Sequence, residues 1–134
     1  MAALFISSDI VSRMVSHCVR CLPHEACGLL AGRDSAVERI FAITNIEPSP
    51  VSYLMDPAEQ FRAMKEMRQE GAAQLAIYHS HPASPAVPSG IDVAQAFFDE
   101  AVYIIVGLLD PDKPDIRAYR IVEGKVNEAE IVID

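Results

Sequence analysis

Positive charge is scarce in this chain: 11 Lys and Arg residues stand against 19 Asp and Glu, giving a net charge of −8 over 134 residues. A nucleic-acid partner requires clustered Lys and Arg to neutralise its phosphates, so this balance argues against one. The longest apolar run, from Ala101 to Leu109, is too short to cross a bilayer, so no membrane partner is expected. The first residues, Met1 to Ile6, lack the basic start of a signal peptide, which leaves the cytoplasm as the expected location.

Cysteine is also rare, and its odd count of three argues against a framework of disulfides. Cys18 and Cys21 form a C-x-x-C, a spacing found in zinc sites and redox pairs. No second C-x-x-C is present to complete a structural zinc site. Apolar residues recur at helical spacing around Cys18, which places it on the buried face of a helix. We therefore predict a core position for it, with a second zinc site or a redox pair as the alternative.

Composition and patterning predict one folded domain over residues 1–134. Apolar residues make up 51% and charged residues 22%, which is typical of a globular chain rather than a disordered one. Helices are predicted over residues 8–22, 57–70 and 89–99. Strands are predicted over residues 26–31, 37–44, 102–109, 116–122 and 125–133, and another begins at residue 74 and carries His79 and His81. This order predicts an α+β fold, an α/β/α-like sandwich in which helices flank a mixed, curved sheet.

The most informative pattern is His-x-His-x7-Ser-x-x-Asp, formed by His79, His81, Ser89 and Asp92. Two imidazoles and one carboxylate are ligands of a catalytic zinc, whose fourth position stays open for water. On a strand, residues two apart face the same way, so His79 and His81 project together while Ser80 points away. Ser89 followed three residues later by Asp92 is a helix-start signature that turns Asp92 toward the strand end. The alternatives are a plain capping box and unrelated histidines.

These residues resemble the motif of the JAMM (MPN+) metallopeptidases, in which a glutamate precedes His-[Ser/Thr]-His-x7-Ser-x-x-Asp. The glutamate corresponds to Glu25, which is followed by Ala-Cys-Gly and an apolar pair. Residues 53–57 and 76–82 also resemble the compact prokaryotic subgroup. The resemblance implies a JAMM/cytidine-deaminase-like architecture and one zinc ion per chain, held by His79, His81 and Asp92. It also implies that Glu25 is the general acid and base; Ser89 would then donate a hydrogen bond to the oxyanion.

The substrate implied by the resemblance is a ubiquitin-like sulfur-carrier protein or its C-terminal peptide, cleaved at a peptide or isopeptide bond. A tail ending in Gly-Gly can add to an exposed sheet edge, and we expect residues 45–53 to border its groove. A non-catalytic MPN-type scaffold or protein-binding module is the main alternative. A deaminase-like zinc hydrolase is a further one, but its Pro-Cys-x-x-Cys pattern is missing from the sequence. The oligomeric state does not follow from the sequence.

Overall fold

A computed structural model describes residues 3–134 of the chain. It contains the helices α1 (Ser8–Cys21), α2 (Pro57–Gln69) and α3 (Gly90–Ala94). The strands are β1 (Leu4–Ile6), β2 (Cys27–Arg33), β3 (Ala36–Ile43), β4 (Ala73–His81), β5 (Val102–Gly107), β6 (Asp115–Val122), β7 (Lys125–Ala129) and β8 (Ile131–Ile133). All eight strands form one sheet in the order β7-β6-β5-β4-β2-β3-β1-β8. β4 and β5 run parallel while β2 and β4 run antiparallel, so the predicted mixed sheet of an α+β fold is confirmed.

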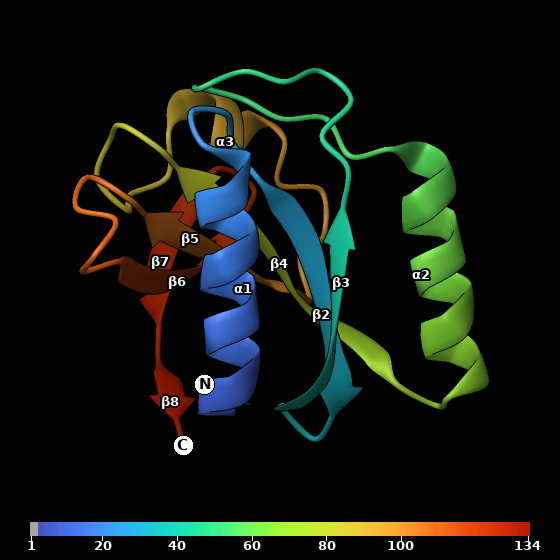
Figure 1. Cartoon of the computed structure of the whole chain (residues 1–134). Coiled ribbons are helices and arrows are strands. Elements are labelled where there is room, and N and C mark those ends of the chain that lie inside the picture. Colours follow the sequence, from blue (N-terminus) through green and yellow to red (C-terminus); the bar gives the residue numbers. More distant parts are fainter. Residues whose placement is uncertain (1–2) are drawn as a thin grey trace.

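The helices cover both faces of the sheet. Alternation along β2 sends Leu30 into the buried cluster that also holds Met14 and Cys18 of α1. Its neighbour Leu29 enters a second cluster, which contains Met67 of α2. Figure 1 shows α1 and α2 on opposite sides of β2 and β3. The predicted α/β/α arrangement is therefore present.

Two helices begin at the caps that the sequence predicts. The hydroxyl of Ser7 accepts a hydrogen bond from the backbone N–H of Ile10 at the start of α1. At the start of α2, the carboxylate of Asp56 accepts from the N–H of Ala58, and Pro57 occupies the first helical position. These caps fix both helix starts within one residue of the prediction.

Two expectations about the elements were wrong, and one strand was missed. The third helix was predicted over residues 89–99 but ends at Ala94, and beyond it the backbone N–H of Phe98 donates to the Tyr103 hydroxyl instead of continuing the helix. The last strand was predicted as one run over residues 125–133 but divides at Glu130. Its second part, β8, pairs with β1, a three-residue strand at the other end of the chain that the sequence did not predict. The pairing of β8 with β1 joins segments more than 100 residues apart, and local sequence patterns do not predict such long-range pairing.

No helix within residues 3–134 combines the length and the apolar character that spanning a membrane would require.

Candidate metal centre

The C-terminal end of β4 places two histidines on one face of the sheet. β4 lies between β2 and β5, and His79 and His81 are almost fully buried there, with exposed fractions of 2% and 3%. Ser80 points to the opposite face, where its hydroxyl oxygen accepts a hydrogen bond from the N–H of Ala26 at 2.8 Å. The predicted alternation along this strand is confirmed.

Asp92 reaches both histidines from the first turn of α3. Its Oδ2 lies 2.9 Å from Nε2 of His81, and its Oδ1 lies 3.2 Å from Nε2 of His79. The ligand atoms of these three residues all lie within 4.8 Å of one another. Among residues 3–134 no other group of His, Cys, Asp or Glu side chains converges in this way. The structure thus brings together the three residues that the sequence singles out.

The hydrogen bonds of His81 make the site suited to a cation. Nδ1 of His81 lies 2.7 Å from the carbonyl oxygen of Pro85, which can only accept, so we assign the hydrogen to Nδ1. In the neutral ring, Nε2 then presents a lone pair to the Asp92 carboxylate and to Nε2 of His79, which is 3.2 Å away. Burial lowers the pKa of His81, but the hydrogen bonds with Asp92 and Pro85 outweigh burial and raise it. Positive charge is therefore favoured among these atoms, and two imidazoles with one carboxylate fit a three-ligand zinc site.

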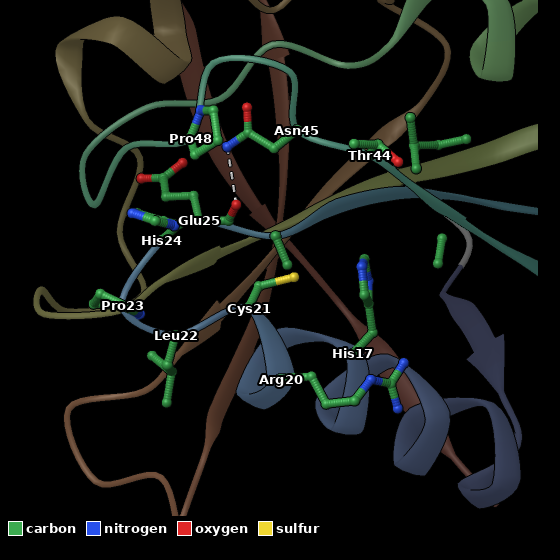
Figure 2. Close-up of a pocket in the computed structure, with 13 residues that line it drawn as sticks. His17, Arg20, Cys21, Leu22, Pro23, His24, Glu25, Thr44, Asn45 and Pro48 are labelled. Carbon is green, nitrogen blue, oxygen red and sulfur yellow. Dashed lines mark hydrogen bonds between the residues drawn. The ribbon is translucent and has the colours of Figure 1, made fainter.

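Glu25 lies two residues before the start of β2, close to Asp92 and His81 of the converging group. Its backbone is held by loop 44–52: its N–H donates to the carbonyl of Ser49 at 2.8 Å, and its own carbonyl accepts from the Asn45 side chain at 3.0 Å (Figure 2). The side chain is buried, and its Oε1 has no hydrogen-bond partner. Burial and the neighbouring Asp92 raise the pKa of Glu25 to about 8, although His81 lowers it. A buried carboxyl oxygen without a partner is what a general base would offer to a water molecule.

The raised pKa of Glu25 should make the metal-free protein less stable as the pH rises. An unfolded chain releases this proton near pH ~4.3, whereas the folded protein keeps it up to about pH 8. Between these values the folded state binds more protons, so the free energy of unfolding falls with pH. Glu25→Gln removes this contribution, and we expect it to raise the melting temperature of the metal-free protein more at pH 8 than at pH 5. An equal shift at both pH values would contradict the raised pKa.

Ser89 is the cap of α3. Its hydroxyl oxygen accepts from the N–H of Asp92 at 3.1 Å, and its own N–H donates to Oδ2 of Asp92 at 2.9 Å. The capping-box interpretation is confirmed. The cap uses the hydroxyl oxygen as an acceptor and leaves the hydroxyl hydrogen free. Donation of that hydrogen to an oxyanion is therefore compatible with the cap and stays a prediction.

Two residues that contact the histidines were missed from the sequence. Pro85 supplies the carbonyl that orients His81, and Tyr53 stacks on the ring of His79 with centroids 5.0 Å apart and an interplanar angle of 29°. Neither contact can be predicted from the spacing of residues in the sequence. Tyr53 lies within the segment expected to border the groove, but nothing in that segment predicts a contact with a ligand.

The C-x-x-C does not form a metal site. Cys18 is fully buried in the core beside Met14, and burial raises the pKa of its thiol to about 12. Cys21 is half-buried, and all three cysteines are free. No metal-binding group within residues 3–134 includes either of them. The predicted core position of Cys18 is confirmed.

Comparison with known proteins identifies relatives along nearly the whole chain. Residues 7–122 match the family described as prokaryotic homologs of the JAB domain. The chain is 42% identical to the CysO-cysteine peptidase of Mycobacterium tuberculosis over 127 residues, which cover 93% of this chain and 87% of that protein. It is 37% identical to the probable TtuB-protein conjugate cleaving protease of Thermus thermophilus, over 91% of this chain and 78% of that protein.

Solved structures share the fold. A solution structure of a protein from Desulfitobacterium hafniense superposes with a TM-score of 0.89 at 38% identity, over 98% of this chain and 92% of that one. The crystal structure of a JAB1/MPN domain protein from Archaeoglobus fulgidus matches with a TM-score of 0.62 at 19% identity, over 98% of this chain and 99% of that one. At 19% identity the second match supports the architecture alone.

Proposed function

The chain belongs to the prokaryotic JAB-domain family of JAMM-type peptidases, and from this premise we propose that it is a zinc-dependent hydrolase of conjugates of a ubiquitin-like sulfur-carrier protein. The bond cleaved is a peptide or isopeptide bond at the carrier's C-terminus. The similarity to a CysO-cysteine peptidase and to a TtuB-conjugate cleaving protease supports this substrate class. One zinc ion per chain is part of the proposal, and the cytoplasmic location stays a prediction.

The proposal rests on a buried cluster of two imidazole nitrogens and one carboxylate, beside which lies a carboxyl oxygen without a hydrogen-bond partner. Nε2 of His79, Nε2 of His81 and the carboxylate of Asp92 converge, and Oε1 of Glu25 is buried without a hydrogen bond. A structural ion pair would need no such oxygen, whereas hydrolysis needs a base next to the ligands. A non-catalytic scaffold, the main alternative, would require neither feature.

Each residue has a distinct part in the proposed reaction. His79, His81 and Asp92 would hold a zinc ion, which when bound polarises the carbonyl and activates water at neutral pH. Glu25 accepts the proton of the attacking water and returns it to the departing amine. The hydroxyl of Ser89 donates a hydrogen bond to the oxygen on which negative charge develops. No covalent acyl-enzyme is needed.

Two cavities lie beside the proposed site, one lined by Glu25 and the other by Tyr53, and we assign one side of the scissile bond to each. Because Glu25 must protonate the amine, the leaving group belongs on its side, where a cavity of about 540 Å³ is bordered by His24 and Pro48 (Figure 2). We assign the acyl side to the region of Tyr53, which stacks on His79. There a cavity of about 220 Å³ is lined by Tyr53, Leu54 and Phe98 among others. Tyr53, at the end of the segment expected to border the groove, lines this second cavity, whereas Asn45 and Pro48 of that segment line the first.

The function is tested with a carrier protein whose C-terminal Gly-Gly is joined either to cysteine or to a lysine of a second protein. Zinc-loaded enzyme should release a carrier that ends at Gly-Gly, as measured by intact mass spectrometry. A chelator should abolish the release, and added zinc should restore it. If the zinc-loaded protein leaves both conjugates intact, the proposed substrate class is wrong.

The groove assignment predicts a change in KM. The sequence alone suggests replacing Val51 to Tyr53 with Gly and Ser, but Tyr53 contacts His79, so exposed Val51 and Leu54 are the cleaner targets. Val51→Ser/Leu54→Ser should raise KM for the carrier several-fold and leave kcat nearly unchanged, because apolar contact with the tail is lost while the ligands and the general base stay intact. Val126→Ser, an exposed apolar residue of β7 at the edge of the sheet, is the matched control. An unchanged KM would reject the groove.

A further inference from the structure

The two histidines of the candidate centre are held in different ways. Nδ1 of His81 donates to the Pro85 carbonyl, a contact that fixes both its tautomer and its ring orientation. Nδ1 of His79 is equally buried but has no hydrogen-bond partner. Metal-binding histidines almost always direct their second nitrogen to a carboxylate, a carbonyl or water. No carboxylate or carbonyl of residues 3–134 therefore orients His79 in the way that Pro85 orients His81.

The ring of Tyr53 covers one face of His79. Its centroid lies 5.0 Å from that of the imidazole, and the planes differ by 29°, which is a stacked arrangement. The ring of His81 also lies 5.0 Å away but is tilted by 60°, so it gives no comparable flat surface. Rotation of the His79 ring about its side-chain bonds would break the contact with Tyr53.

Tyr53 is itself held in place on both sides. The Asn45 side chain donates to the carbonyl of Ser52 at 3.4 Å and accepts from the N–H of Leu54 at 3.0 Å. The same side chain also donates to the carbonyl of Glu25. The backbone that carries Tyr53 is thereby tied to the start of β2, next to the general base, and the tyrosine ring is presented to His79 from a fixed segment.

We propose that Tyr53 is a positioning residue of the metal centre, whose ring provides for His79 the orientation that the Pro85 carbonyl provides for His81. The inference rests on the proposed function, because the ligand set is part of that proposal. It assigns no chemistry to the phenol hydroxyl. Stacking holds the His79 imidazole with Nε2 directed at the metal position, so removing the Tyr53 ring frees a ligand whose Nδ1 is not held by any group of the described residues.

The test compares Tyr53→Phe, which keeps the stacked ring, with Tyr53→Leu, which removes it. Zinc affinity is measured by competition with a chromophoric chelator, and the ligand geometry by the visible spectrum of the cobalt-substituted protein. Tyr53→Leu should bind zinc about tenfold more weakly and alter the cobalt bands. Tyr53→Phe should match the wild type in both measurements. If Tyr53→Leu does not fold, Tyr53→Met gives the same comparison.

Leu54→Ala is the matched control, since Leu54 lines the same cavity but makes no stacking contact with His79. An equal loss of zinc affinity in Leu54→Ala would assign the effect to loop packing and overturn the proposal. Weaker binding in Tyr53→Phe would overturn it as well, because the hydroxyl would then be responsible. A wild-type protein that binds no zinc would refute the proposed function, whereas unchanged affinity in Tyr53→Leu would refute only the positioning role.

Discussion

Glu25→Gln should keep its zinc and lose turnover by about 10²- to 10⁴-fold, the usual contribution of a general acid or base. Glutamine has nearly the same shape but cannot accept the proton of the attacking water. Glu25 is not among the converging ligand atoms, so its replacement leaves His79, His81 and Asp92 intact. Zinc content by elemental mass spectrometry and kcat on a carrier conjugate are the two measurements.

The pKa of Glu25 supports a role in both halves of the reaction. Burial first, and then the nearby Asp92, raise it to about 8. A cation among the ligands would lower the pKa of Glu25 toward neutral pH. Near neutral pH both the basic form, which accepts a proton, and the acidic form, which donates one, would then be available. Glutamine has no such equilibrium, so the pH dependence of the remaining activity should lose one ionisation.

Glu123→Gln is the matched control for this variant. Glu123 is an exposed carboxylate in the turn between β6 and β7, outside the groove and the ligand set, so its substitution should leave the activity unchanged. A fully active Glu25→Gln protein would remove the general-base assignment. A Glu25→Gln protein without zinc would instead place Glu25 among the ligands.

Local patterns in the sequence predicted the parts of the site that depend on local geometry. His79 and His81 are two residues apart on a strand, and a period of two is enough to place them on one face. Ser89 and Asp92 form a capping box, which fixes the direction of Asp92 from three residues of sequence. Strand and helix-start geometry thus determine all three proposed ligands.

The contacts that hold these ligands could not be predicted from the sequence. Tyr53 stacks on His79 across 26 residues of chain, and the pairing of β1 with β8 joins the two ends of the described chain. The third helix was predicted to be too long because its apolar spacing continues past Ala94. In the structure the helix ends there, and the N–H of Phe98 donates to the Tyr103 hydroxyl. Each of these features is decided by tertiary packing, which outweighs local propensity.

His81→Ala should abolish zinc binding, and with it all turnover. The substitution removes one of three ligands, so the loss of affinity should exceed the roughly 100-fold that removal of an outer partner can cause. It also removes the ring that links Pro85 to Asp92, which leaves the Asp92 carboxylate buried beside His79 with one partner fewer. Elemental analysis of the purified protein gives the metal content directly.

Thermal unfolding adds an independent readout of the same substitution. Zinc that binds only the folded state stabilises it by about 2.7 kcal/mol when free zinc is 100 times Kd. The melting temperature of the wild type should therefore rise with added zinc, and that of His81→Ala should not. Asp92→Asn should show an intermediate response, because it keeps both imidazoles but loses the negative charge that favours the cation.

Cys21→Ser distinguishes this centre from a cysteine-based one. Cys21 lies half-buried at the end of α1 and takes no part in the converging group, so its replacement should leave the zinc content unchanged. Cys18 is a poorer control because it is fully buried in the core. Zinc that survives the loss of His81 but leaves with Cys21 would mean a structural cluster at the end of α1. In that case β4 and α3 would hold only an internal ion pair, and the hydrolase assignment would fall.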